Sequence, residues 1–426
     1  MSASSCSTAC KLFMVVIPFI FVFICIWFGK SDYRTLVLNS IISTATNTKD
    51  FELSVQTFRQ RKCTVSPTIR SNVSCKQVIT DFRPYLVIPI HRGHFGDASR
   101  FFQTFIANVV DLERIDIQVI LSDDQEARDF MARLQQDNVL FEKINIHFWS
   151  FPRLLQSFGI KLYQDWGVFS HKLPYLSLKK LAALYVSKQW QYALILDCEV
   201  VIRKKTNFTE VFLDFFISPY MFYENATIHR WMTDGSRTAV RIPDSVLPSR
   251  DTFVGQYHGW FLERSIFDKF MDHVLYNSTD LLRWAHSVPH FSNEHMYSYW
   301  LLWNRNGMAS HYTFIDIPEL LKTFLSAELM KRFYPAWNTR HAPQGTFECI
   351  YCWATPEIVD LLNPFFMAYK LTFYDYHADH SNKVGDCTLI RLLNTVPTMG
   401  IQVTSQWDAK GTWDQLDCSK VYRGTS

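Results

Sequence analysis

The chain has 426 residues and a formal net charge of +3, with 19% charged and 16% aromatic residues. This length can hold one large α/β domain or two ordinary ones, and it is ample for a substantial core. Acidic and basic residues are interspersed along the chain. Nucleic-acid binding needs a clustered basic face, so we expect no nucleic-acid partner.

An apolar run from residue 12 to residue 28 carries no charge and is bounded by Lys11 and Lys30. Its 17 residues are at the short end for a helix that spans a bilayer. A cleaved signal peptide would have a shorter apolar core followed by small residues, which the segment at residues 27–30 does not provide. We therefore predict a cytosolic tail at residues 1–11 and one transmembrane signal anchor at residues 12–28.

The segment after the anchor contains four Asn-x-Ser/Thr sequons, at Asn72, Asn207, Asn225 and Asn277. Such sequons can be glycosylated only in the secretory lumen. They predict a single-pass type II membrane protein whose larger part is luminal. Residues 29–80, rich in Ser, Thr and Asn up to about residue 78, are typical of a luminal stem.

Seven cysteines follow the anchor, and in an oxidising lumen six of them could form three disulfides. The spacing suggests that Cys63 pairs with Cys75. Cys198 is then left as a small buried residue. Three connectivities stay open for the other four, Cys349, Cys352, Cys387 and Cys418.

Strand and helix patterns alternate from Tyr85 onward. Apolar strands are predicted at residues 85–90, 117–121 and 144–149, with helices at residues 97–110 and 124–135 between them. This order predicts an α/β fold with a mostly parallel sheet flanked by helices on both faces. Ligands of such sheets bind beyond the carboxyl ends of the strands, so the loops after the strands are expected to hold the site residues.

The loop after the first predicted strand contains His91, Arg92 and Gly93. We interpret these residues as cofactor-binding, because a backbone with glycine can approach a nucleotide closely. The alternative is a tight turn that needs glycine. Asp123 and Asp124, after the second strand, could hold a ribose or a uracil, or compete as the metal pair. The alternative is that Ser122 or Asp123 caps the following helix.

A helix predicted from Tyr175 to Lys188 carries Lys179 and is preceded by Lys172. Either lysine could reach a phosphate as a point charge, although a lysine on a helix is usually just solvated. The apolar run at residues 192–196 comes next. It is long enough for one buried strand and too short for a helix.

Asp197 and Glu199 follow that strand directly. Residues two apart project to the same side if the chain stays extended, so the two carboxylates could form half the shell of a divalent cation. Mg²⁺ and Mn²⁺ favour oxygen ligands, and substrate phosphates and water can fill the other positions. The alternative is an ordinary strand end with a solvated turn.

Residues 191–204 resemble the Asp-x-Asp motif of GT-A-fold glycosyltransferases, with Glu199 in place of the second Asp. The helix that leads into the strand follows the same pattern, and the resemblance spans roughly residues 83–306. It implies a Rossmann-like GT-A domain at residues 81–426. Residues 81–206 would form the nucleotide-sugar half and residues 207–426 the acceptor half.

The resemblance also implies roles in the acceptor half. Residues 257–263 look like the strand that lines the acceptor site. Glu294, at the start of a predicted helix, is the candidate general base that takes the proton from an acceptor hydroxyl. A glutamate that only stabilises the helix start is the alternative. His377 is a candidate metal ligand, since many GT-A enzymes use a C-terminal His.

These features together predict a metal-dependent glycosyltransferase of the Golgi or ER membrane. A sugar would move from a nucleotide-sugar, by family habit a uridine diphosphate sugar, to a glycan, glycoprotein or glycolipid acceptor. Mn²⁺ or Mg²⁺ would be held by Asp197 and Glu199, with Asp197 also counted as catalytic. A non-catalytic relative that binds glycans or a partner stays open because of Glu199, and a metal hydrolase would need an HExxH or equivalent motif, which the sequence does not contain.

Overall fold

The structure of the chain is a computed structural model. It describes residues 83–141, 144–169, 172–217, 219–225, 230–247, 252–255, 259–276, 280–288, 290–324, 326–328, 359–363, 366, 372–374, 383–402 and 418–423. Among the helices of these residues, none is both long and apolar enough to cross a bilayer. The predicted tail, anchor and stem lie outside the described residues.

The main sheet has five strands in the order β3-β2-β1-β4-β8. Its first four strands in the chain run parallel to their neighbours, whereas β8 pairs antiparallel with β4. The strands are β1 (Tyr85–Pro89), β2 (Asp116–Leu121), β3 (Asn145–Ser150), β4 (Tyr192–Ile195) and β8 (Trp260–Glu263). The expected α/β fold with a mostly parallel sheet is confirmed.

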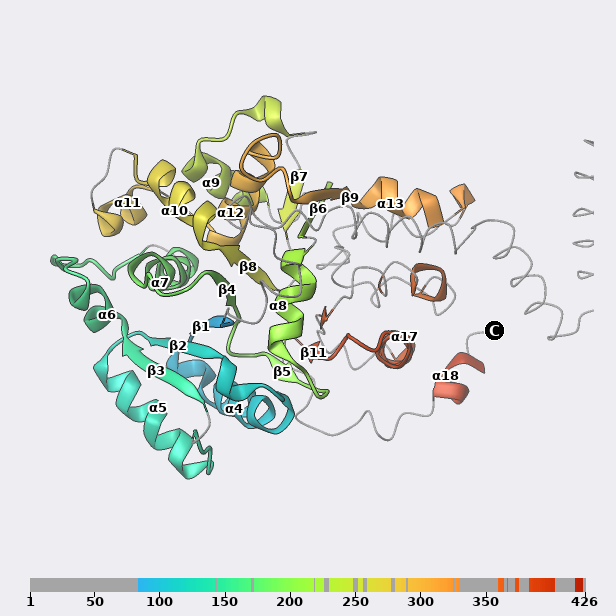
Figure 1. Ribbon diagram of the computed structural model, residues 1–426, viewed down its shortest axis with the longest axis horizontal. Helices are drawn as coiled ribbons and strands as arrows, with labels where there is room; N and C mark the ends of the chain where they lie inside the picture. Colours follow the sequence, from blue (N-terminus) through green and yellow to red (C-terminus); the bar gives the residue numbers. More distant parts are fainter. Residues whose placement is uncertain are drawn as a thin grey trace, which may run out of the picture. The chain divides into compact units, whose positions relative to one another are not determined.

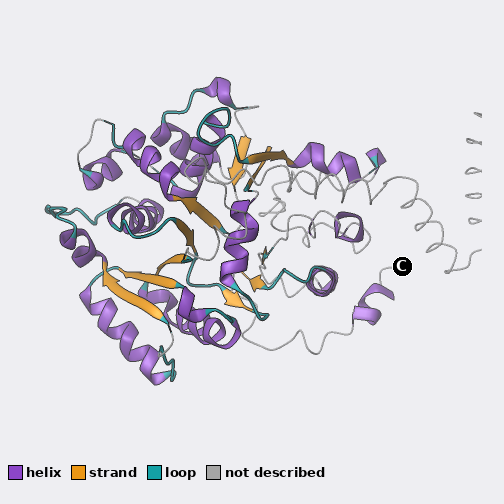
Figure 2. Ribbon diagram, in the orientation of Figure 1, coloured by secondary structure: helices purple, strands orange, loops and turns teal. Residues whose placement is uncertain are grey.

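Helices cover both faces of this sheet. In Figure 1, α4 (Phe95–Asn108) and α5 (Asp124–Gln136) lie on one side of the strands, and α7 (Lys172–Val186) lies on the other. Figure 2 shows the strands as a layer between helices. Because both faces are covered, every residue of β1 and β4 is buried, which explains their continuous apolar sequences.

The chain direction follows from the strand order. From β1 the chain steps outward through α4, β2 and α5 to β3, where α6 (Phe151–Ser157) follows at once. It then returns through α7 to β4 on the other side of β1. The order therefore reverses between β1 and β4. For the predicted strands and helices up to residue 196, most of the ends lie within three residues of the ends in the structure.

The chain after β4 adds two small sheets and returns one strand, β8, to the main sheet. The small sheets have the orders β7-β6-β9 and β10-β11-β5. Their strands are β5 (Val201–Ile202), β6 (Tyr220–Asn225), β7 (Thr252–Gly255), β9 (Thr313–Asp316), β10 (Phe373–Tyr374) and β11 (Ile401–Gln402). The predicted halves at residues 81–206 and 207–426 thus share the main sheet.

The remaining helices pack around these sheets. They are α8 (Phe208–Ile217), α9 (Arg230–Val240), α10 (Arg264–Val274), α11 (Leu281–Ser287), α12 (Asn293–Trp303), α13 (Ile317–Phe324), α17 (Lys383–Thr395) and α18 (Cys418–Arg423). Short 3-10 turns are η2 (Arg92–His94), η3 (Leu112–Arg114) and η5 (Asp244–Val246). Helix α12 is buried from Asn293 to Leu302, so its polar residues need partners inside the protein.

One of the open cysteine connectivities is resolved. Cys387 and Cys418 form a disulfide that joins α17 to α18. Cys198 is a buried free thiol, as the sequence predicts. The cysteines at 63, 75, 349 and 352 lie outside the described residues, so their pairing stays a prediction.

Candidate active site

The candidate site lies at the carboxyl edge of the main sheet, where the strand order reverses between β1 and β4. Open α/β sheets bind ligands at such a switch point, because the loops after the two strands diverge and leave a crevice. The loop after β1 contributes residues 91–97, and the loop after β4 contributes Asp197 and Glu199.

The chain at Asp197 and Glu199 is not extended, so the two side chains do not follow the alternation expected of a strand. Strand β4 ends at Ile195, and residues 198–199 form a turn in which the Val200 N–H donates to the Asp197 carbonyl at 3.3 Å. The two carboxylates therefore have different partners. Asp197 contacts Lys180, and Glu199 contacts His94.

Glu199 belongs to a group of three residues with metal-ligand atoms. One atom each from His94, Asp97 and Glu199 lies within 4.8 Å of the other two. His94 Nδ1 is 2.8 Å from Glu199 Oε1 and 3.4 Å from Asp97 Oδ2. Partial burial raises the pKa of Glu199, and the negative charge of Asp197 raises this pKa further, whereas His94 opposes the shift.

A buried lysine joins the strand end to helix α12. Lys180 of α7 places Nζ 3.0 Å from Asp197 Oδ1 and 2.5 Å from Glu294 Oε1. The side chains of Lys180 and Glu294 are 4% and 7% exposed, whereas that of Asp197 is 40% exposed. Only Asp197 therefore presents this network to solvent.

The charges of this network support one another. Burial lowers the pKa of Lys180, but the carboxylates of Asp197 and Glu294 outweigh it and raise the pKa above its usual value. Burial likewise raises the pKa of Glu294, and Lys180 outweighs it, so the net shift is downward. The Ser292 hydroxyl adds a hydrogen bond of 2.5 Å to Glu294 Oε2. Glu294 is thus a buried, ionised and fully engaged carboxylate.

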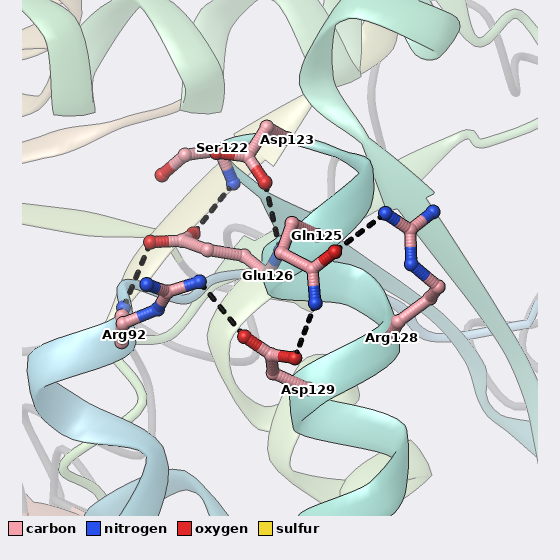
Figure 3. A network of polar contacts seen from close by, with 7 residues as sticks. All are labelled: Arg92, Ser122, Asp123, Gln125, Glu126, Arg128 and Asp129. Carbon is pink, nitrogen blue, oxygen red and sulfur yellow. Dashed lines mark hydrogen bonds and ion pairs between the residues drawn. The ribbon is translucent and has the colours of Figure 1, made fainter.

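The predicted loop residues His91, Arg92 and Gly93 have local partners. The ring Nδ1 of His91 accepts from the Gly93 N–H at 3.1 Å. The Arg92 guanidinium donates to the Asp129 carboxylate of α5 at 2.8 Å, as Figure 3 shows. Neither Gly93 nor Gly96 has a positive φ. Their nucleotide-binding role stays a prediction.

Asp123 caps a helix, which was the alternative to a role in nucleotide binding. Its Oδ1 accepts from the Glu126 N–H at 2.7 Å at the N-terminus of α5. Glu126 then accepts from the backbone N–H groups of Arg92 at 3.1 Å and Ser122 at 2.9 Å (Figure 3). This buried carboxylate ties the loops after β1 and β2 together. A contact from Asp123 to a ribose stays a prediction.

The two predicted lysines occupy different environments. Lys172 is exposed at the first position of α7, and its charge acts on Glu199. Lys179 is 2% exposed and donates from Nζ to the Ile90 carbonyl at 2.9 Å and to the Ser122 hydroxyl at 3.3 Å. These hydrogen bonds join α7 to the ends of β1 and β2. The buried position of Lys179 therefore does not support the expectation that it reaches a phosphate.

Lys179 gives a testable pH dependence. Burial lowers its pKa from 10.5 to about 8, while Glu126 opposes the shift. Between these pH values the unfolded chain binds more protons, so the free energy of unfolding rises with pH. The measurement is urea unfolding at pH 7.5 and at pH 9.5. From the lower to the higher pH, the free energy of unfolding of the native protein should rise by about 2 kcal/mol more than that of the Lys179→Met variant. An equal change in both proteins would contradict the lowered pKa.

Sequence reasoning missed His94, Asp97 and Lys180. The spacing His94-x-x-Asp97 at the start of a helix was an available signal, because residues three apart share a helix face. No sequence pattern distinguishes Lys180 from Lys179, because their different partners depend only on tertiary packing. His377 lies outside the described residues and stays a prediction.

No protein-family model matches the chain, and no curated protein matches its sequence. The solved structures that are similar to this chain include three glycosyltransferases. Mouse xyloside xylosyltransferase 1 in its apo form has 14% identity and a TM-score of 0.33, over 55% of this chain and 85% of that one.

The mannosyltransferase Ktr4p from S. cerevisiae has 7% identity and a TM-score of 0.37, over 66% of this chain and 84% of that one. The galactosyltransferase LgtC, solved with donor and acceptor sugar analogs, has 11% identity and a TM-score of 0.28, over 54% and 72%. Because each TM-score is below 0.5, we infer the function from the residues of the site itself.

Proposed function

We propose that the protein is a metal-dependent glycosyltransferase that uses a nucleotide-sugar donor. One observation carries the proposal: carboxylates after β4 meet ligand-type side chains after β1 at the switch point of a mostly parallel sheet. Such a crevice suits a nucleotide, and carboxylates beside it suit the cation that accompanies a diphosphate.

The residues present fit a hard divalent cation. Asp197 and Glu199 are 40% and 36% exposed at their side chains, so each carboxylate can reach a ligand from solvent. When bound, Mn²⁺ or Mg²⁺ supplies Lewis-acid stabilisation of the charge that develops on the leaving nucleotide. Lys172 is exposed and its charge acts on Glu199, and in this proposal it would add a positive charge for the diphosphate.

Lys180 and Glu294 act as positioning residues in this proposal. Lys180 fixes the Asp197 carboxylate through its 3.0 Å contact, and Glu294 neutralises the buried lysine. Glu294 fits poorly as a general base, because its lowered pKa and its engaged oxygens make it a weak proton acceptor. Positioning donor and acceptor and excluding water would then supply most of the rate enhancement.

The donor class rests on the resemblance to GT-A-fold glycosyltransferases, and the setting rests on segments of the sequence. We propose a uridine diphosphate sugar as donor and a glycan, glycoprotein or glycolipid as acceptor. The apolar run at residues 12–28 and the four sequons support a type II protein with a luminal catalytic domain in the Golgi or ER membrane.

The first test measures thermal stability of the full-length chain with a panel of nucleotide-sugars, with and without Mn²⁺. A ligand that binds only the folded state adds about 2.7 kcal/mol of stability at a hundred times its Kd. We expect one donor to raise the melting temperature only when Mn²⁺ is present. The shift should vanish in Asp197→Ala and survive better in Glu199→Asp than in Glu199→Ala.

The control variant is Asp272→Ala, which removes an exposed carboxylate of α10. It should bind the donor like the native protein. The second measurement is release of free nucleotide when candidate glycans are added. A folded chain that responds to no donor would count against a transferase and favour a non-catalytic binding protein.

A further inference from the structure

The loop after β1 contains two side chains to which the proposed function assigns no individual role. His94 is the last residue of η2, and Asp97 lies in the first turn of α4. The two are three positions apart at the entry to a helix. Both face Glu199, which comes from a loop about a hundred residues later in the chain, so the fold and not local sequence brings the three together.

The spacing of their atoms suits one coordination sphere. Metal–oxygen bonds of about 2.1 Å in octahedral geometry place neighbouring ligand atoms about 3.0 Å apart and opposite ones about 4.2 Å apart. Here His94 Nδ1 lies 2.8 Å from Glu199 Oε1 and 3.4 Å from Asp97 Oδ2. One ligand atom from each of the three residues lies within 4.8 Å of the other two.

Exposure and charge fit an ion that also contacts substrate. The side chains of His94, Asp97 and Glu199 are 43%, 29% and 36% exposed, which leaves room for water or phosphate oxygens. Two carboxylates meet here, and Asp197 adds a third negative charge. Arg100 approaches the other oxygen of Asp97 at 4.0 Å, and Lys172 acts on Glu199.

We propose that His94 and Asp97 bind the divalent cation together with Glu199. The inference rests on the proposed function, whose cation it places between the loop after β1 and the loop after β4. The imidazole favours a first-row transition ion over Mg²⁺, which prefers oxygen ligands. The rival arrangement is a protonated His94 that pairs with both carboxylates and binds no metal.

The experiment uses electron paramagnetic resonance of Mn²⁺ bound to the full-length chain, with Mn²⁺ alone and with Mn²⁺ plus uridine diphosphate. Pulsed spectra report a directly bound imidazole as a nitrogen coupling, which changes when histidine is labelled with ¹⁵N. We expect that coupling in native protein and in His147→Ala, which alters an exposed histidine of β3. It should be lost in His94→Ala.

Affinity gives a second readout. Loss of an outer-shell partner already weakens metal binding about 10–100-fold. We therefore expect His94→Ala and Asp97→Asn to raise the Kd for Mn²⁺ at least about tenfold. Circular dichroism and unfolding curves of each variant check that it is folded.

Three outcomes would overturn the inference. Bound Mn²⁺ without nitrogen coupling would exclude His94 as a ligand. A coupling lost in His377→Ala and kept in His94→Ala would assign the imidazole to the C-terminal region, and in both cases the proposed function would stand. A folded chain that binds no Mn²⁺, with or without uridine diphosphate, would overturn the metal dependence of the proposed function as well.

Discussion

Replacing Lys180 by methionine is expected to destabilise the protein by about 3–5 kcal/mol. Lys180 is the cationic partner of Glu294, whose side chain is 7% exposed, so the variant leaves a buried carboxylate without compensation. Methionine fills a similar volume, which separates loss of charge from loss of packing. The measurement is urea unfolding of native and variant protein near neutral pH.

The double variant Lys180→Met/Glu294→Gln separates the ion pair from other effects. Removing both charges should restore much of the lost stability, because a buried pair can often be replaced by neutral groups at little cost. The two single variants and the double variant form a cycle that gives the coupling energy. A coupling below about 0.5 kcal/mol would mean that the 2.5 Å contact contributes little.

Lys179→Met is the matched control, since Lys179 is the adjacent buried lysine of the same helix. Its Nζ donates to a carbonyl and a hydroxyl, so no carboxylate loses its partner. The loss of stability should be smaller than in Lys180→Met. The Lys180→Met variant should also lose donor binding, because Asp197 loses the contact that orients it.

The sheet and its helices could be predicted because they depend on local patterns. The strand at Tyr85–Pro89 is apolar throughout, and helix α4 carries Phe101, Phe102 and Phe105 on its buried face. The strand order explains why loops far apart in the chain meet. The sequence patterns do not determine that order, because the rules for connecting parallel strands leave a handful of orders open.

The site could be predicted only in part, because its contacts depend on tertiary packing. Asp197 and Glu199 stand out as a change of polarity at the end of a strand. The directions in which their side chains point could not be predicted, because the turn at Cys198 breaks the alternation of side chains that an extended chain would have. Lys179 and Lys180 are equivalent in sequence terms, yet they point about 100° apart around a helix, and only Lys180 reaches the carboxylates.

Asp111 is another buried carboxylate, and it accepts three hydrogen bonds. Its Oδ1 accepts from the Phe208 N–H at 2.9 Å, and its Oδ2 accepts from the Thr209 N–H at 2.8 Å and the Thr209 hydroxyl at 2.6 Å. It thereby caps the N-terminus of α8 from the segment that follows α4. A negative charge at a helix N-terminus also complements the helix dipole.

Asp111→Ala is expected to cost at least about 4 kcal/mol, because hydrogen bonds to a charged group contribute about 1.5–3 kcal/mol each and the three donors become buried without a partner. Phe208 and Thr209 are 0% and 4% exposed, so water cannot easily replace the carboxylate. Urea unfolding of the variant measures the loss.

The control for Asp111→Ala is Asp280→Ala, which removes the cap of α11. Asp280 also accepts from two backbone N–H groups, those of Leu282 and Arg283, but its side chain is 31% exposed. Water can reach the uncapped helix end, so the expected cost is only about 1 kcal/mol. Equal destabilisation of the two variants would contradict this prediction. It would mean that burial of the Asp111 cap adds nothing to the loss of stability, so that Asp111 stabilises α8 no more than an exposed cap would.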